Sequence, residues 1–300
     1  RVDAEQEADR FLHDMRHFAG LLAERGRDAF GFLHLTFQEY FVGRALARMN
    51  PEQRWASIVP HLHDPRWREP ILLCAGQLGI VEQRSDSVDD LLSRILDAGS
   101  EYEADLHRDT LLAAEMIADD VGPSAERETA VFERLKPLLA SRTPAVCSAA
   151  ATGLIHLVRL GHGPAADFLR QSLQARKQPA VTLLNALRHF AREAFLFGWA
   201  SEISRCLEDG DSSIKAASIG ALASVVGRVA AVQKAVLACL SGSDSYVRFA
   251  AVSALSGAVG TDAAVQKAVL ACLSDSDSSV RSAAVSALSG AVGTDAAVQK

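Results

Sequence analysis

Few side chains in this sequence have the type and spacing needed for chemistry. His61 and His63 lie near Cys74, and these residue types bind zinc, but no second Cys/His pair with ligand spacing follows them. We therefore expect surface or capping histidines and no metal site. Neither a serine-nucleophile elbow nor a phosphate-binding G-x-x-x-x-G-K-[ST] loop occurs in the 300 residues. We expect no catalytic residue in this segment.

His34 is the side chain best placed to meet a ligand. It lies just before an expected helix start, where unpaired backbone N–H groups and the helix dipole favour anions. An imidazole there can donate a hydrogen bond to a phosphate oxygen, and protonation makes that bond charge-assisted. A lone histidine can equally satisfy a backbone carbonyl of its own domain. Spacing alone favours this structural role.

The residues around His34 predict a helix, a hairpin and a second helix. Residues 5–18 place apolar side chains on one helical face, and residues 20–25 and 29–33 are expected to form two strands. Thr36 and Glu39 have the spacing of a capping box, which predicts a helix that ends before Asn50. Its expected buried face includes Phe37, Tyr40, Phe41 and Leu46. A winged-helix domain ends with this order of elements.

The C-terminal third carries an internal repeat. Val232, Val265 and Val298 are spaced 33 residues apart. Residues 229–261 and 262–294 differ only at four pairs of positions, which are Val229/Asp262, Gly242/Asp275, Tyr246/Ser279 and Phe249/Ser282. Each unit has two stretches with apolar side chains at helical spacing, separated by turn residues, and this pattern predicts a pair of amphipathic helices. One pair cannot bury its apolar stripe alone, so the pairs must stack.

Two series of residues in the repeat favour different roles. Arg248 follows Asp244 by four residues, and Lys215 and Arg281 occupy the same place in their units, so we expect an inter-repeat ladder of aspartates and basic side chains. Tyr246 and Phe249 are three residues apart and lie off the expected core stripe. Their replacement by serine in the next unit fits a partner-binding surface, although neutral drift at exposed positions is the alternative.

Composition and charge exclude several classes of partner. The formal net charge is −6, whereas a nucleic-acid-binding domain is expected to carry a basic face, so a nucleic acid partner is not expected. The longest apolar run, near residues 71–81, is too short to span a bilayer, and no secretory signal is visible. Cys206, Cys239 and Cys272 recur at one position of the apolar stripe, which predicts buried packing thiols in a reducing cytoplasm.

Both parts of the chain resemble known families. The pattern Asp-x-x-Val-Arg-x-Ala-Ala-x-x-Ala-Leu at residues 244–255 and 277–288 resembles the HEAT repeat, with a diverged copy at 211–222 and weaker copies near 146–154 and 180–187. The segment Phe-Gly-Phe-Leu-His-Leu-Thr-Phe-Gln-Glu-Tyr-Phe at residues 30–41 resembles the winged-helix motif of NACHT-type STAND NTPases. Residues 20–22, 64–69 and 106–115 also fit that family, so the close resemblance covers about residues 8–120.

The resemblance to NACHT-type proteins implies a nucleotide switch. In this class an upstream module binds ADP at rest and the winged helix holds the module closed. The histidine of the motif, here His34, reaches the bound diphosphate, so the implied cofactor is ADP or ATP, bound mainly by the upstream module. A protein or other macromolecular ligand on the C-terminal repeats releases the lock. ATP exchange and assembly into a homo-oligomer then bring effector domains together.

We therefore predict a mainly α fold. Residues 1–50 would be the winged-helix end of a NACHT module with a short β-hairpin, residues 51–103 a helical connector, and residues 104–300 an α-solenoid of HEAT-like helix pairs. Because the chain begins without methionine and stops inside another copy of the repeat, we expect a fragment whose solenoid continues beyond residue 300.

The predicted function is that of a cytoplasmic sensor in bacterial defence or signalling, with no enzymatic activity in this segment but an NTPase in the parent protein. The alternative is a HEAT-repeat scaffold or adaptor for protein–protein interaction without nucleotide switching. HEAT-like phycobilin lyases would offer an enzymatic role, but the N-terminal motif has no place in them.

Overall fold

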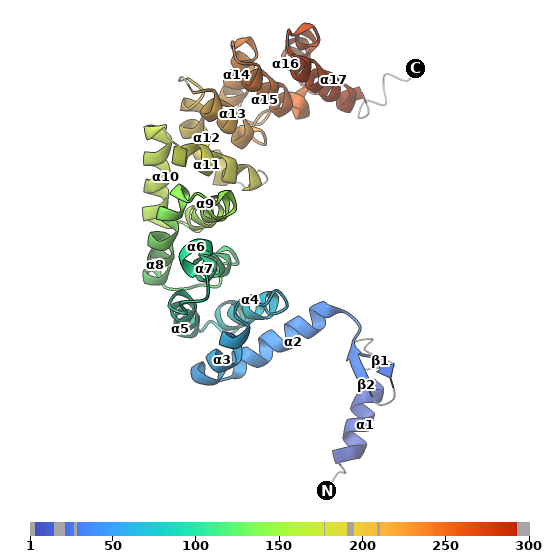
Figure 1. Ribbon diagram of the computed structural model, residues 1–300. Helices are drawn as coiled ribbons and strands as arrows, with labels where there is room; N and C mark the ends of the chain where they lie inside the picture. The colour runs from blue at the N-terminus through green and yellow to red at the C-terminus, as the bar shows by residue number, and fades with distance from the viewer. Residues whose placement is uncertain are drawn as a thin grey trace. The chain divides into compact units, whose positions relative to one another are not determined.

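The computed structural model describes residues 4–14, 22–26, 29–176, 178–190, 195–208 and 211–292, and these residues are almost entirely helical (Figure 1). The chain forms two compact units, Arg1–Val131 and Phe132–Lys300. The domain boundaries inferred from the sequence remain predictions. The mainly α fold class, with one short hairpin and a helical repeat region, is confirmed.

Unit 1 begins with the expected helix, hairpin and helix. These are α1 (Ala4–Asp14), β1 (Leu22–Gly26), β2 (Ala29–Phe32) and α2 (Leu35–Arg48). The strands are antiparallel, with Leu22 opposite Phe32. The remaining residues of the predicted first helix, and part of the predicted first strand and turn, lie outside the described residues. The hairpin and the end of α2 before Asn50 are confirmed, and Asn50 itself caps the next helix by accepting a bond from the Gln53 N–H.

The capping box predicted at Thr36 is wrong. The N-cap of α2 is His34, whose backbone is extended, and its carbonyl accepts a 3.2 Å hydrogen bond from the Phe37 N–H. Helical geometry has therefore already begun at Leu35, and Thr36 lies inside the first turn. A side chain can serve as the cap only where the backbone is still outside the helix.

The predicted buried face of α2 is also largely wrong. Phe37, Tyr40 and Phe41 are 37%, 42% and 40% exposed, and only Leu46 is buried. The reason lies in how α2 packs. Its C-terminal half lies against α4, where Gly43 lets the two backbones approach, whereas its N-terminal half carries these aromatic side chains on an exposed surface.

The rest of unit 1 is a series of short helices that pack around an aliphatic core. They are α3 (Pro51–Ile58), η2 (Val59–His61), α4 (Arg68–Gly76), the π-helical turn η3 (Gln77–Val81), α5 (Ser85–Leu96), α6 (Glu103–Leu106), α7 (Arg108–Ala118) and α8 (Ala125–Leu135), which runs into unit 2. α5 has the clearest amphipathic pattern, and it buries Val88, Leu91, Leu92 and Ile95. This spacing is the i, i+3, i+4, i+7 stripe of a helix that covers a core.

In unit 2 two layers of helices alternate (Figure 1). One layer is α9 (Pro144–Arg159), α11 (Gln178–Leu187), α13 (Ser212–Leu222), α15 (Ser245–Leu255) and α17 (Ser278–Val292), and each of these helices packs against the next. The other layer is α10 (Gly163–Ala175), α12 (Phe195–Arg205), α14 (Ala230–Ala238) and α16 (Ala263–Ala271). Short turns η4 (Lys136–Ala140), η5 (Arg188–Phe190), η6 (Cys239–Ser241), η7 (Ser256–Ala258) and η8 (Cys272–Ser274) connect them.

These layers confirm the repeat predicted from the sequence. The two weak copies near residues 146–154 and 180–187 lie on α9 and α11, the first two helices of the layer that ends with α17. Aspartates cap four helices of this region. Asp211, Asp244, Asp262 and Asp277 each accept hydrogen bonds from backbone N–H groups in the first turn, which satisfies donors that a helix start would otherwise leave unpaired.

Candidate functional site

His34 occupies an exposed position at the start of α2. Its ring makes no capping bond and lies 6.1 Å from the Phe37 ring, centroid to centroid. Within the described residues, His34 donates no side-chain hydrogen bond to a backbone carbonyl, which is the structural role that spacing alone favoured. The ring is therefore available to an external group at the positive end of the α2 dipole.

The surface around His34 is apolar and exposed. It consists of Leu33, Leu35, Phe37, Tyr40 and Phe41, and we call it the α2 apolar patch. Its rings contact one another and the hairpin. The centroid of the Phe41 ring lies 5.5 Å from that of Tyr40 and 5.7 Å from that of Phe32 on β2. Exposed aromatic surface of this kind is suited to contact with another protein element.

The histidines near Cys74 have structural partners. His63 Nε2 lies 2.6 Å from the buried Asp109 carboxylate and 3.1 Å from the Ser100 hydroxyl, and the His61 ring stacks on Trp67 with centroids 4.4 Å apart. Burial raises the pKa of the Cys74 thiol to about 12. Among the described residues, no group of three or more His, Cys, Asp or Glu side chains could hold a metal ion.

The ladder expected between repeats is present at one junction. Arg248 on α15 donates Nε and Nη2 hydrogen bonds of 2.8 Å each to the Asp275 carboxylate of the next unit, and Nη1 bonds the carbonyls of Gly242 and Ser243. The guanidinium beside Asp275 lowers the pKa of that carboxyl to about 2. A bidentate arginine–carboxylate pair is strong and also fixes the relative orientation of its two partners, so this pair joins the two units in a defined geometry.

A second contact closes the same junction. Gln233 on α14 donates a 2.7 Å hydrogen bond from Nε2 to the Asp262 carboxylate, which also caps α16. Asp262 and Asp275 are two of the four positions at which the near-identical units differ. Half of these differences therefore concern the contact between repeats.

The other two differences lie on the surface, as the sequence predicted. Tyr246 is 62% exposed and Phe249 is 38% exposed, both on α15. With Arg188, they line a groove of about 410 Å³ over α13 and α15, whose floor is made of alanine, glycine and serine. Arg188 lies over Gly220, where an added Cβ would come within 2.9 Å of its Nε. A groove lined by a cation and two exposed aromatic rings suits a partner surface.

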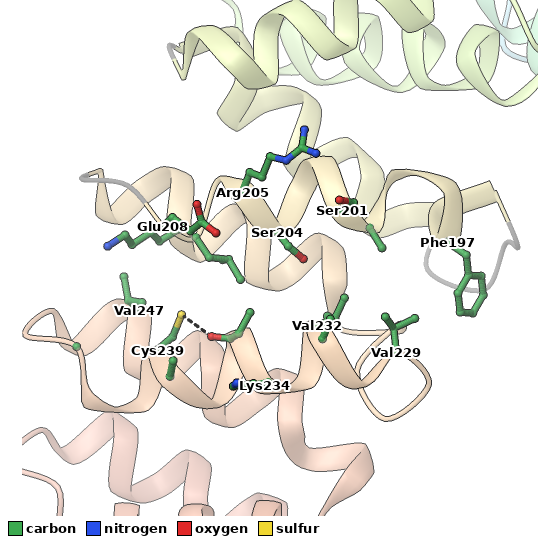
Figure 2. A pocket seen from close by; sticks show the side chains of 17 residues that line it. Phe197, Ser201, Ser204, Arg205, Glu208, Val229, Val232, Lys234, Cys239 and Val247 are labelled. Carbon is green, nitrogen blue, oxygen red and sulfur yellow. Dashed lines mark hydrogen bonds between the residues drawn. The ribbon is translucent and has the colours of Figure 1, made fainter.

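A larger cleft of about 850 Å³ lies between α12 and α14. In Figure 2 the Ser204 side chain points from α12 into this cleft, while Val229 and Val232 point into it from α14. Arg205 points away from α14 in the same view. Cys239 lines the cleft too, with its thiol bonded to the Ala235 carbonyl at 3.4 Å. Lys215, Lys234 and Glu208 supply its remaining charges.

The sequence analysis missed this cleft. The signal was present in the comparison of repeats, because Val229 and Gly242 replace the aspartates that form contacts at the following junction. The expected packing role of the cysteines holds for the four that are buried, Cys74, Cys206, Cys239 and Cys272, while Cys147 is half-buried. All five cysteines carry free thiols.

Two family models match the chain. Residues 1–46 match the winged helix-turn-helix domain C-terminal to NACHT, and residues 200–289 match HEAT repeats. These matches confirm the two resemblances drawn from the sequence, although the winged-helix match ends at residue 46 and does not reach residues 64–69 or 106–115. The matched segments are a winged-helix and a repeat region, and neither is a known catalytic domain. No described helix is long and apolar enough to cross a membrane. Among curated proteins, none matches the chain.

Several solved structures are similar to the chain at low identity. Human deoxyhypusine hydroxylase in complex with glycerol is 17% identical over 86% of this chain and 97% of its own, with a TM-score of 0.34. An engineered protein is 17% identical over 87% and 89%, with a TM-score of 0.38. A designed armadillo repeat protein in complex with the peptide (KR)4 is 16% identical over 78% and 98%, with a TM-score of 0.29. At such scores these similarities carry no argument about function.

Proposed function

We propose that this chain, which joins the winged helix that follows NACHT to a region of HEAT repeats, is the locking and sensing part of a nucleotide-switched signalling protein. The observation that carries the proposal is the match of residues 1–46 together with the position of His34. The ring stands at the N-cap of α2, beside the α2 apolar patch, with no hydrogen-bond partner of its own among the described residues.

In this proposal the α2 apolar patch packs against an upstream nucleotide-binding module, and His34 donates a hydrogen bond to a phosphate oxygen of bound ADP. The cost of exposing five apolar side chains is removed once the module covers them. Opening of the lock would allow exchange for ATP and assembly into a homo-oligomer. The protein would act in the cytoplasm, in defence or signalling.

The repeats would supply the sensor surface. Tyr246, Phe249 and Arg188 form the part of it that is best defined by geometry, since two exposed aromatic rings and a cation line one groove. Interface cores favour aromatic residues and arginine. The partner would be a protein or another macromolecular ligand.

The test of the switch is the nucleotide content of the purified full-length protein, measured for the wild type and for His34→Ala. We expect stoichiometric ADP in the wild type, and loss of ADP or oligomerisation without a trigger in the variant. His63→Ala is not a suitable control, because His63 bonds the buried Asp109. His189→Ala is suitable, because His189 is an exposed histidine of η5.

If neither protein carries nucleotide, the switch proposal fails and the chain is better described as a HEAT-repeat scaffold for protein–protein interaction. The sensor surface is tested separately with the double variant Tyr246→Ser, Phe249→Ser, which copies the serines of the next repeat. We expect its thermal stability to stay close to wild type while signalling output is lost, with the exposed Tyr102→Ser as a matched control. A large loss of stability would place both rings in the core and end the sensor interpretation.

A further inference from the structure

Adjacent repeats in unit 2 are not joined in the same way. At the junction of residues 229–261 with 262–294, Arg248 holds Asp275 and Gln233 holds Asp262. The preceding junction has the equivalent positions one repeat earlier. At that junction Lys215 is in the position of Arg248, and Gly242 is in the position of Asp275. Ala200 and Val229 are in the positions of Gln233 and Asp262. Both carboxylates and the glutamine amide are thus missing from the earlier junction.

The earlier junction has a cation, Lys215, but no carboxylate at the position equivalent to Asp275. Within the described residues, the Lys215 ammonium has no carboxylate or hydrogen-bond partner, while the Lys215 backbone N–H donates to the Asp211 carbonyl. Gly242 presents only backbone where the next repeat presents Asp275. The backbone itself is the same at both places, with φ −67° and ψ 154° at Gly242 and φ −62° and ψ 147° at Asp275. A carboxylate could therefore stand at position 242 without a change of fold.

The cleft between α12 and α14 lies at this junction. Its walls are mostly apolar, with Phe197 on α12 and Val229 and Val232 on α14, as Figure 2 shows. Among the described lining residues, Lys215 and Lys234 bring two positive charges and Glu208 one negative charge, while Arg205 points away from α14. The Ser204 hydroxyl is buried and has no hydrogen-bond partner among the residues that the structure describes. Lys215 also acts electrostatically on Cys239, another wall of the cleft.

We propose that this cleft binds a small amphiphilic carboxylate, whose charged end pairs with Lys215 in the place that Asp275 takes in the next repeat. The apolar body of the ligand lies between α12 and α14 against Phe197 and Val229. The volume of the cleft, about 850 Å³, falls within the ~300–1,000 Å³ typical of small-molecule pockets. This site is distinct from the groove of Tyr246 and Phe249.

The chemistry of the cleft selects a carboxylate with an apolar chain over other ligands. A neutral apolar molecule would leave the ammonium of Lys215 unpaired, and a cation would meet Lys215 and Lys234. A polyanion would have to place further charge against the valines of α14. A single anionic head on an apolar body leaves neither mismatch, because charged groups are buried favourably only when they are paired.

Decanoate is the probe, and its binding to the full chain is measured by calorimetry beside neutral 1-decanol. We expect one saturable site for decanoate, and affinity at least tenfold weaker in Lys215→Met. Gly242→Asp should weaken decanoate to the same extent, since the new carboxylate occupies Lys215 itself. The same variant should raise the melting temperature, because it rebuilds a bridge that the next junction already has.

Lys267→Met is the matched control, since Lys267 is the repeat equivalent of Lys234 and lies on α16, away from the cleft. Its affinity for decanoate should equal that of the wild type. The proposal is overturned if decanoate shows no saturable site, if 1-decanol binds as tightly, or if Lys215→Met and Gly242→Asp both stay within twofold of wild type. None of these results bears on the nucleotide content of the full-length protein, so this proposal and the switch fail independently.

Discussion

Replacing Arg54 with methionine should detach the end of α2 from the helices that follow it. Arg54 on α3 is 1% exposed, although it carries a full charge. Its guanidinium donates from Nε to the Leu46 carbonyl at 3.2 Å, and from Nη2 to the carbonyls of Ala47 and Met49 at 3.3 and 2.9 Å. The last carbonyls of a helix have no partner within the helix, so one buried side chain satisfies the C-terminus of α2.

The size of the effect follows from these three bonds. A hydrogen bond to a charged group contributes about 1.5–3 kcal/mol. Loss of the donor also removes the Arg54 bond to the buried Ala47 carbonyl, whereas the Leu46 carbonyl keeps the bond from the Met49 N–H. The three bonds share one donor group and do not add, and the buried Nη1 has no partner, which offsets part of the gain. Methionine fills much of the same volume, so packing loss is small. We therefore expect unit 1 to lose roughly 3 kcal/mol of its free energy of unfolding.

The assay is urea unfolding followed by tryptophan fluorescence in a Trp199→Phe background. Of the three tryptophans, Trp55 and Trp67 then remain, and both report on unit 1. With a slope of about 1.5 kcal/mol per M urea, the midpoint should fall by about 2 M. Arg48→Met is the control, since Arg48 is an exposed arginine at the end of α2, and it should change stability by less than about 0.5 kcal/mol. A loss in Arg54→Met no larger than the control would refute the reasoning.

Three further predictions follow from packing and charge. Gly43→Ala should destabilise unit 1 by about 1–2 kcal/mol, measured by the same unfolding assay, because the new Cβ would lie 2.8 Å from the Leu73 Cβ. Burial lowers the pKa of His156 to about 4, so the stability that the neutral ring supports is complete above pH 6.5 and is lost as pH falls towards 4; His156→Gln should flatten thermal stability over that window. Arg248 lowers the pKa of Asp275 to about 2, so its contribution is complete above pH 3.8 and is lost as pH falls towards 2; Asp275→Asn should therefore lower the melting temperature at pH 7 much more than at pH 2.

The repeat region could be predicted from the sequence because its evidence is redundant. Two units that differ at four positions must pack alike, and the valines and alanines at helical spacing fix which face of each helix is buried. An aspartate also marks the start of the second helix of each unit, as Asp244 does for α15 and Asp277 for α17. The constant spacing of the repeat also identified the copies on α9 and α11, although their sequences have diverged.

The start of α2 could not be predicted in the same way. Phe37, Tyr40 and Phe41 have the composition of a core, and helical periodicity cannot tell a face that covers its own core from one that contacts another protein element. What decides the outcome is the close approach at Gly43, which brings only the second half of α2 against α4. The position of the cap failed for a related reason: Thr36 has suitable chemistry, but the chain turns into the helix two residues earlier.

The four differences between the two near-identical units divide into two kinds with different physical consequences. Tyr246 and Phe249 change what a neighbouring molecule meets and contribute little to the core, since both side chains are exposed. Asp262 and Asp275 change how firmly one repeat holds the next, since each completes a bridge across a junction. The earlier junction, which has no such bridges, keeps the helix packing of α13 on α15. It lacks only the polar contacts that Asp262 and Asp275 make at the next junction. The cleft between α12 and α14 lies at the junction where Val229 and Gly242 take the places that Asp262 and Asp275 hold in the next repeat.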